Sequence, residues 1–151
     1  MLECKINFNA DEQELLRKLG LQKGGPAQKL LDKLVVDWNQ KYVPFETGTL
    51  ARSPYAVSDF GSGQVVYPGP YAHYLYYGEV YGPNIPIVDS DSGLIHWISP
   101  KGQKKHPTGK QLQYSTEMNA LAGSHWFDRM KADHLNDIVK EVEGFVRTQQ
   151  K

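Results

Sequence analysis

The densest group of side chains that could bind a partner is a run of tyrosines in the middle of the chain. Six fall within fifteen residues: Tyr67, Tyr71, Tyr74, Tyr76, Tyr77 and Tyr81. Tyrosine is enriched in protein interfaces and also stacks on sugars and single-stranded bases. No Lys or Arg is interleaved with the run, which disfavours bases because their phosphates need positive charge. Core packing is the third role, and Tyr71 and Tyr74, three residues apart, fit it best.

The other residues able to do chemistry form no known catalytic or metal-binding pattern. The five histidines include no HExxH pair, and Cys4 is the only cysteine. Asp89 to Gly93 begins like a calcium loop, but its glycine comes one position too early, so we predict a turn. Nucleophile-elbow, phosphate-loop and dinucleotide motifs do not occur. The sequence therefore predicts no catalytic residue, no metal and no cofactor, and a protein that is not an enzyme.

Charge is balanced over the chain. Lys and Arg number 17, as do Asp and Glu, so the formal net charge is zero. This balance disfavours general nucleic-acid binding, which needs a basic excess or a basic face. The candidates for a local basic patch are Lys101, Lys104, Lys105 and Lys110. No signal pattern opens the sequence and no apolar run approaches the roughly 20 residues that span a bilayer, so we expect a soluble protein made in a cytoplasm.

Periodicity predicts the elements that must position these side chains. Residues 2–9 alternate apolar and polar, as in a strand with one buried face. Asp11 and Glu14 predict a capped short helix that ends at Gly20. From Ala27 to Tyr42 the apolar residues recur at helical spacing. The chain thus begins with one strand, a short helix and a long amphipathic helix.

The next segments alternate turn formers with short apolar runs. Residues 46–53 are predicted to be extended, and residues 55–60 and 64–67 to form a hairpin around Gly61 to Gly63. Residues 71–78 are aromatic and end in glycine, which predicts a short helix. Most of the tyrosine run would then lie on this helix.

A second hairpin and a last helix follow. Strands are predicted at 85–88 and 94–98, on either side of the turn-rich tip. The basic residues 99–111 are predicted to form an exposed loop. Ser124 is predicted to cap a C-terminal helix with one apolar stripe.

These elements predict an α+β fold. Strands interleaved with a few helices, without regular βαβ alternation, indicate a mostly antiparallel β-sheet packed against the long amphipathic helix, with a C-terminal helix. The length fits a single domain, residues 1–151, with a mobile loop or insertion at about 79–123.

Three strings in a fixed order resemble a known family. Glu46 to Ser53 reads ETGTLARS, Tyr71 to Gly78 reads YAHYLYYG, and Trp126-Phe127 opens the last helix. This order is similar to that of the tail-completion and minor capsid proteins of tailed bacteriophages, especially phages of Gram-positive hosts. That family has a TG-x-L-x-x-S element before a hairpin, a YA-x-Y-x-x-[YF]-G element after it, and an aromatic-led segment entering the final helix.

The resemblance implies a non-catalytic structural protein of the phage neck. Its copies would form a homo-oligomeric ring, although the isolated subunit can be monomeric. The partners would be the head connector or adaptor and the tail terminator or tail tube, without a membrane or sequence-specific nucleic acid. The protein would lie in the virion at the head–tail interface, after synthesis in the host bacterial cytoplasm.

The resemblance also assigns roles to residues. The scaffold positions are Thr47, Gly48, Leu50, Tyr71, Ala72 and Gly78. The candidate contacts with partners or other copies are Tyr74, Tyr76, Tyr77, Tyr81, Lys101, Lys104 and Lys105. Thr47 and Gly48 would turn the chain off the helix into the sheet, and Leu50 would point between helix and sheet. Gly78 would leave the aromatic turn with positive φ.

Two other classes of function stay open. A small ligand-binding module could use the tyrosine cluster to hold a carbohydrate or a similar ligand. An enzyme is the third class, for which the sequence nominates no set of residues.

Overall fold

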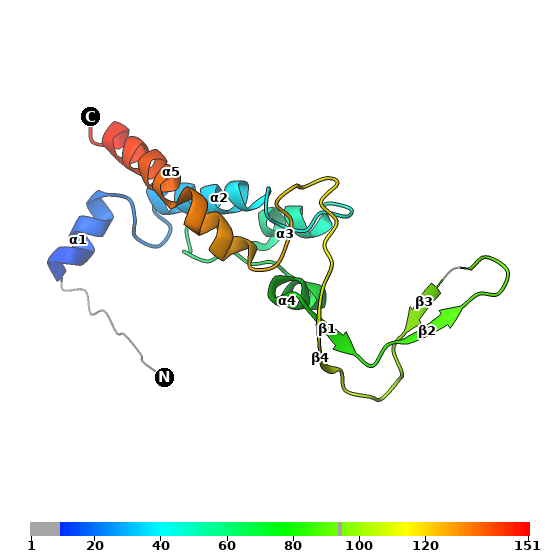
Figure 1. Cartoon of the computed structure of the whole chain (residues 1–151). Helices are drawn as coiled ribbons and strands as arrows, with labels where there is room; N and C mark the ends of the chain where they lie inside the picture. Colours follow the sequence, from blue (N-terminus) through cyan, green and yellow to red (C-terminus); the bar gives the residue numbers. More distant parts are fainter. Residues whose placement is uncertain (1–9, 94) are drawn as a thin grey trace.

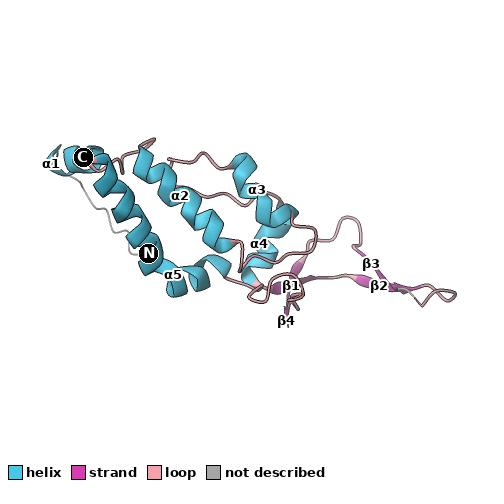
Figure 2. Ribbon diagram, turned by 90° about the horizontal axis from the view of Figure 1, so that it is seen from above, coloured by secondary structure: helices cyan, strands magenta, loops and turns pink. Residues whose placement is uncertain are grey.

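The computed structural model describes residues 10–93 and 95–151 (Figure 1). The predicted strand at residues 2–9 lies outside them. The helices are α1 Ala10–Lys18, α2 Pro26–Asn39, α3 Thr49–Val57, α4 Pro70–Tyr77 and α5 Trp126–Gln149. The strands are β1 Glu79–Gly82, β2 Ile85–Val88, β3 Ile95–Ile98 and β4 His106–Gln111. The fold is α+β, with helices α2 to α5 gathered in one body and the strands in a projection from it (Figures 1 and 2).

The core is built from helix against helix. α2 packs along α5, and the two helices run side by side in both views (Figures 1 and 2). The buried cluster draws on α2, α3, α5 and the segment after α2, and comprises Leu34, Tyr42, Val43, Ala51, Trp126, Met130 and Ile138. The predicted packing of a sheet against the long helix is therefore wrong. The apolar stripes of α2 and α5 bury each other, whereas β2, β3 and β4 are exposed throughout their described residues.

The long helix ends one turn earlier than its apolar spacing predicts. It begins at Pro26, where proline is tolerated, and ends at Asn39. The backbone N–H groups of Tyr42 and Val43 both donate to the Asn39 carbonyl, at 2.9 and 3.0 Å. This turn buries Tyr42, whose hydroxyl donates to Asp133 of α5 at 2.5 Å. The side chains after the helix thus complete the contact between α2 and α5.

The segment predicted to be extended and then a strand is instead helix α3. Gly48, with φ of 79°, turns the chain directly into it. Pro54 lies inside this helix and has no N–H to offer the Leu50 carbonyl. The Ser53 hydroxyl donates to that carbonyl instead, at 2.7 Å. The Leu50 carbonyl therefore keeps a hydrogen bond, and the helix continues past Pro54. The predicted hairpin at 55–67 is wrong, because residues 55–57 belong to α3 and residues 58–60 and 64–67 are irregular.

The strands form a projecting arm, which we define as residues 79–93 and 95–111. β1 pairs antiparallel with β4 at its base, and β2 with β3 beyond. The turn at the tip is confirmed, since the Asp89 carboxylate accepts the Asp91 N–H at 2.9 Å. The predicted loop at 99–111 is wrong in its second half, because His106 to Gln111 find a strand partner in β1, far away in the sequence. Figures 1 and 2 show the arm pointing away from the helices.

Helix α5 begins later than predicted. Ser124 is not its cap; His125 precedes the helix in a left-handed conformation, with φ of 48°. Its backbone N–H donates to the Tyr76 carbonyl at 2.7 Å. The end of α4 therefore fixes where α5 starts, and Trp126 follows directly into the core.

Candidate functional site

The tyrosines of α4 divide between the core and the surface. Tyr71 is 76% exposed, so its predicted place in the core is wrong. Ala72 is buried and Tyr76 packs against the core cluster, because these two lie on the inward face of the short helix. Tyr77 is exposed, and Tyr74 is half-buried against Tyr81 of β1, with ring centroids 4.6 Å apart. The cluster is thus both a core element and an accessible aromatic face.

Trp126 holds the inner tyrosines in place. Its ring meets Tyr76 edge-on at 4.7 Å and Tyr67 at 5.4 Å between centroids. The Tyr76 hydroxyl donates to Asp128 at 2.9 Å. Burial, together with that carboxylate, raises the pKa of Tyr76 to about 12. The hydroxyl therefore stays protonated at neutral pH and acts as a hydrogen-bond donor.

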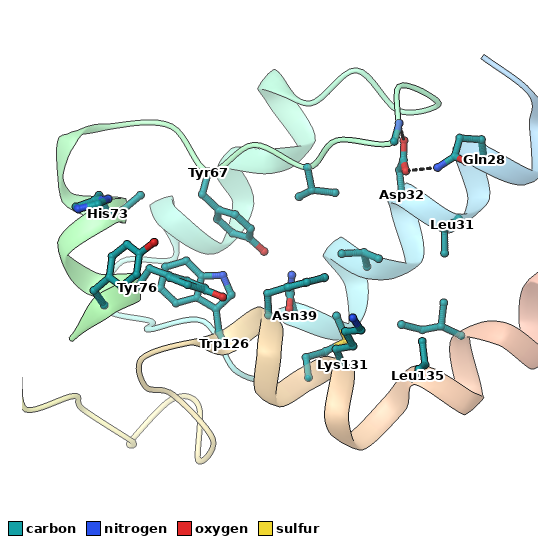
Figure 3. Close-up of a pocket in the computed structure, with 18 of the residues that line it drawn as sticks. Gln28, Leu31, Asp32, Asn39, Tyr67, His73, Tyr76, Trp126, Lys131 and Leu135 are labelled. Carbon is teal, nitrogen blue, oxygen red and sulfur yellow. Dashed lines mark hydrogen bonds between the residues drawn. The ribbon is translucent and has the colours of Figure 1, made fainter. Parts of the chain in front are cut away.

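Beside this cluster lies an apolar groove of about 650 Å³ (Figure 3). It lies between α2, α4, α5 and the irregular segment before α4, and we call it the groove. Its main apolar walls are Leu31, Val35, Tyr67, Tyr76, Trp126 and Leu135. Leu135 is 47% exposed and Phe127 is also exposed at the rim. A cavity of this size, mostly apolar with a few polar groups, is typical of a binding site.

Two buried polar groups lie in the wall of the groove. The side-chain oxygen of Asn39, a residue only 1% exposed, and the Tyr67 hydroxyl are both closed off from solvent. Figure 3 shows Tyr67 reaching toward Asn39 from the opposite wall. Burial raises the pKa of Tyr67 well above its usual value, and the Asn39 amide opposes that rise. The pair is therefore neutral and buried.

Asp32 builds the wall of the groove opposite α5. It is 3% exposed on α2, and its carboxylate accepts the backbone N–H groups of Gly61 and Gly63 at 2.7 and 3.0 Å. Gln28, one turn earlier, donates to it at 2.8 Å. These bonds hold the irregular segment against α2. Sequence reasoning missed Asp32, although an acid within an apolar helical stretch, with a Gly-Ser-Gly string downstream, was a usable signal.

Asp32→Ala is expected to lower the free energy of unfolding by about 1–3 kcal/mol, because it leaves the buried N–H of Gly61 and the partly buried N–H of Gly63 without an acceptor. Chemical unfolding followed by circular dichroism measures this loss. The matched control is Asp37→Ala, an exposed carboxylate on the same helix that accepts only the Tyr55 hydroxyl among the bonds described, with an expected loss below about 1 kcal/mol. Equal losses would show that Asp32 does not hold the segment.

The arm is the second candidate surface. Its outer hairpin exposes large apolar side chains, namely Ile85, Ile87, Val88, Ile95, Trp97 and Ile98. Trp97 is 67% exposed. Contiguous exposed apolar side chains on a soluble domain mark a surface that another molecule covers.

Of the three lysines predicted to contact partners, Lys105 is the one that lies beside the tyrosines. Lys101, Lys104 and Lys105 are all exposed. Lys105 donates to Asn84 at 3.1 Å, where the arm bends. It also lines a second groove, of about 1070 Å³, together with Tyr71, Tyr74 and Tyr81. Lys101 and Lys104 lie apart from this lining, on the loop between β3 and β4.

The predicted scaffold residues lie in the helical body and not in a sheet. The turn at Thr47 and Gly48 leads into helix α3, and the Thr47 and Thr49 hydroxyls share a hydrogen bond of 2.9 Å there. Leu50 packs against the helical core cluster. Gly78 has φ of 72° and caps α4, which confirms the predicted positive φ. A Cβ there would come within 2.9 Å of Ser124.

Buried tyrosines predict a dependence of stability on alkaline pH. Burial and the hydrogen bond to Asp133 raise the pKa of Tyr42 to about 12, whereas an unfolded tyrosine titrates near about 10. Between these values the unfolded chain loses a proton that the folded protein keeps. We therefore expect the free energy of unfolding to be constant up to about pH 10 and to fall toward about pH 12. Urea unfolding at a series of pH values measures this slope.

Tyr42→Phe provides the check. It should be less stable at neutral pH, because Asp133 loses its donor, and its stability should fall less steeply in the alkaline range. A slope identical to that of the unchanged protein would mean that Tyr42 does not contribute.

Within residues 10–93 and 95–151, no three or more His, Cys, Asp or Glu side chains are grouped so that they could hold a metal ion. In the same part of the chain, every helix is too short or too polar to cross a membrane.

No protein-family model matches this chain, nor does any curated protein or any solved structure. The surfaces described above, the groove and the arm, are therefore the basis for a function.

Proposed function

We propose that this chain is a structural, non-catalytic protein of the neck of a tailed phage, one subunit of a ring that joins the head connector to the tail. The observation that carries the proposal is the arm. A two-stranded ribbon is marginally stable alone, and this one leaves its large apolar side chains in water. Such an element gains its stability from a partner, which is the property of an assembly protein.

The three strings of the resemblance support the specific assignment. Residues 46–53 form the turn and first part of α3, residues 71–78 form α4 with its glycine cap, and Trp126 starts α5. Each string lies where the helical body is tied together, since Leu50, Tyr76 and Trp126 all belong to the core or pack on it. The three strings therefore lie at positions that hold this body together, as the scaffold role implied by the resemblance requires.

The partners follow from this role. The subunit would contact the head connector or adaptor on one side and the tail terminator or tail tube on the other. It would be made in the bacterial cytoplasm and remain in the virion. Repeated contacts between identical subunits around an axis need a head-to-tail interface that closes on itself.

A phage that lacks this protein provides the test. Its lysate should contain filled heads and separate tails, and addition of the purified chain should restore joined particles in electron micrographs. A lysate that lacks the protein and yet contains complete virions would refute the assignment.

The groove favours a second candidate, a module that binds a small ligand such as a carbohydrate. Tyr76 and Tyr77 line the groove, whose mostly apolar walls with a few polar groups are typical of a small-ligand site. A glycan array probed with the protein and with Tyr77→Ala tests it. Tyr74→Ala, outside this lining, is the control. Binding lost only in Tyr77→Ala would favour the ligand-binding role over the neck.

A further inference from the structure

We propose that two copies of this chain pair through their arms, with strand β3 of one copy antiparallel to β3 of the other. The two outer hairpins, each made of β2, β3 and the turn between them, then form one four-stranded sheet. Its two-fold axis passes through His96, in the middle of β3. The contact goes beyond the neck role and does not rest on it, because it forms between free chains.

Pro86 determines which edge of the outer hairpin can accept another strand. It faces Trp97 across the ribbon, and because proline has no N–H, no hydrogen bonds join these two residues. The N–H and C=O groups of Trp97, and those of Ile95 two residues earlier, therefore point away from β2. β3 has no other strand partner among the described residues. Its outer edge thus presents both donors and acceptors, whereas Pro86 offers only a carbonyl on the outer edge of β2.

The outward groups of β3 set the register of the pair. In antiparallel strands, hydrogen bonds join facing residues whose backbone groups both point across the gap. Ile95 of each copy therefore faces Trp97 of the other, which makes four backbone hydrogen bonds, two for each facing pair. Both side chains are large and exposed in the single chain, and in the pair each covers part of the other.

The charged side chains of the outer hairpin and its base favour the antiparallel order. Between residues 83 and 105, the acidic residues are Asp89 and Asp91, at the tip, and the basic residues are Lys101, Lys104 and Lys105, in the loop after β3. The tip thus carries −2 and the base +3. Antiparallel pairing brings each tip beside the base of the other copy, whereas arms in the same orientation would bring like charges together.

The register derived from the backbone also aligns opposite charges. Asp91 and Lys101 each lie five residues from His96, on opposite sides of it. Asp91 of one copy therefore faces Lys101 of the other, and the two-fold axis repeats this contact.

The pair is closed and does not grow into a fibre. Both copies use the same surface, so the contact is isologous. The outer edges of the four-stranded sheet are the two β2 strands, where Pro86 hinders the addition of another strand. An arm held in a pair has to separate before it contacts a neck component, so the pair is a state of the free protein.

Disulfide cross-linking tests the register. Cys4, the only cysteine, is changed to serine, and either His96→Cys or Ile87→Cys adds one thiol. Residues 87 and 96 are exposed and face each other across the ribbon, so they lie on the same face. In the pair, the two His96 positions are neighbours, within the roughly 7 Å between Cα atoms that a disulfide spans. The two Ile87 positions are three strand spacings apart, about 14 Å.

Oxidised glutathione at about 1 mM protein should therefore link most of the His96→Cys chain into dimers on a non-reducing gel, and little of the matched Ile87→Cys chain. Thermal unfolding of the two reduced variants should match that of the unchanged protein, since both positions are exposed.

A charge exchange tests the antiparallel order. Asp91→Lys and Lys101→Glu each place like charges opposite each other twice in a pair of identical copies, and a mixture of the two variants restores opposite charges. The Asp91 side chain accepts none of the hydrogen bonds described in the turn, which are made by Asp89. At low salt, each variant alone should pair about 10-fold more weakly than the unchanged chain, and their mixture should regain its strength. Light-scattering mass over a concentration series measures this.

Three outcomes would overturn the contact. They are an unchanged chain that stays single up to about 1 mM, equal cross-linking of the two cysteine variants, and a mixture of charge variants that pairs no better than either alone. None of them bears on whether heads join tails without the protein, so failure of this contact and failure of the neck role are separable.

Discussion

Trp126→Ala is expected to lower the free energy of unfolding by about 3–5 kcal/mol, the cost of removing a large buried aromatic side chain. Trp126 is 2% exposed and belongs to the core cluster at the start of α5. The rings of Tyr67 and Tyr76 pack edge-on against it. Its removal would loosen α4, α5 and the inner end of the groove together. For a protein of this size, the loss corresponds to a decrease of roughly 6–20 °C in Tm.

Thermal and urea unfolding, followed by circular dichroism, measure this effect. Tyr71→Ala is the matched control, because it removes an exposed aromatic side chain from α4. Its expected effect is within about 0.5 kcal/mol. If both variants lost the same stability, the division of the aromatic cluster into buried and exposed members would be wrong.

Removal of the outer hairpin is expected to abolish head–tail joining while the body stays folded. Gly82 and His106 face each other across β1 and β4, so Asn-Gly in place of residues 83–105 would close a two-residue turn. The outer hairpin packs on no helix among the element contacts described, so Tm should change by only a few degrees, about the effect of 1 kcal/mol. The exposed apolar side chains that need a partner would be gone.

Joined particles in electron micrographs measure the effect, with the shortened chain added to a lysate of a phage that lacks the protein. Ile87→Val combined with Trp97→Phe keeps the arm apolar and should support joining. If the shortened chain still joined heads to tails normally, the arm would have no part in the proposed function.

The sequence predicted the elements that depend on local spacing. The apolar stripes at 27–42 and after Ser124 correspond to α2 and α5, the aromatic run at 71–78 to α4, and the runs around Asp89 to a hairpin. In each case, neighbours along the chain determine the periodicity or the turn. The positive φ of Gly78 was predicted for the same reason.

The errors arose where distant residues decide the structure. Residues 46–53 were predicted to be extended, but within them Ala51 of α3 is buried in the core with Leu34 of α2 and Trp126 of α5. β4 exists because of its pairing with β1. Tyr71 and Tyr76 have the same residue type, but Tyr76 packs against Trp126 and donates to Asp128, both of α5, whereas Tyr71 is exposed.

The groove could not be predicted at all. Its walls come from α2, α4, α5 and an irregular segment, and no single stretch of sequence carries its pattern. Asp32, which holds that segment through two backbone N–H groups, lies about thirty residues from them along the chain.

Light-scattering mass over a concentration series, first for the chain alone and then mixed with neck components of the virion, tests the central claim most directly. The assembly role predicts either a ring of copies or a single or paired subunit that joins a larger particle only in the mixture. A chain that stays single at every concentration and binds none of the virion components would contradict it. That result would favour the ligand-binding role of the groove.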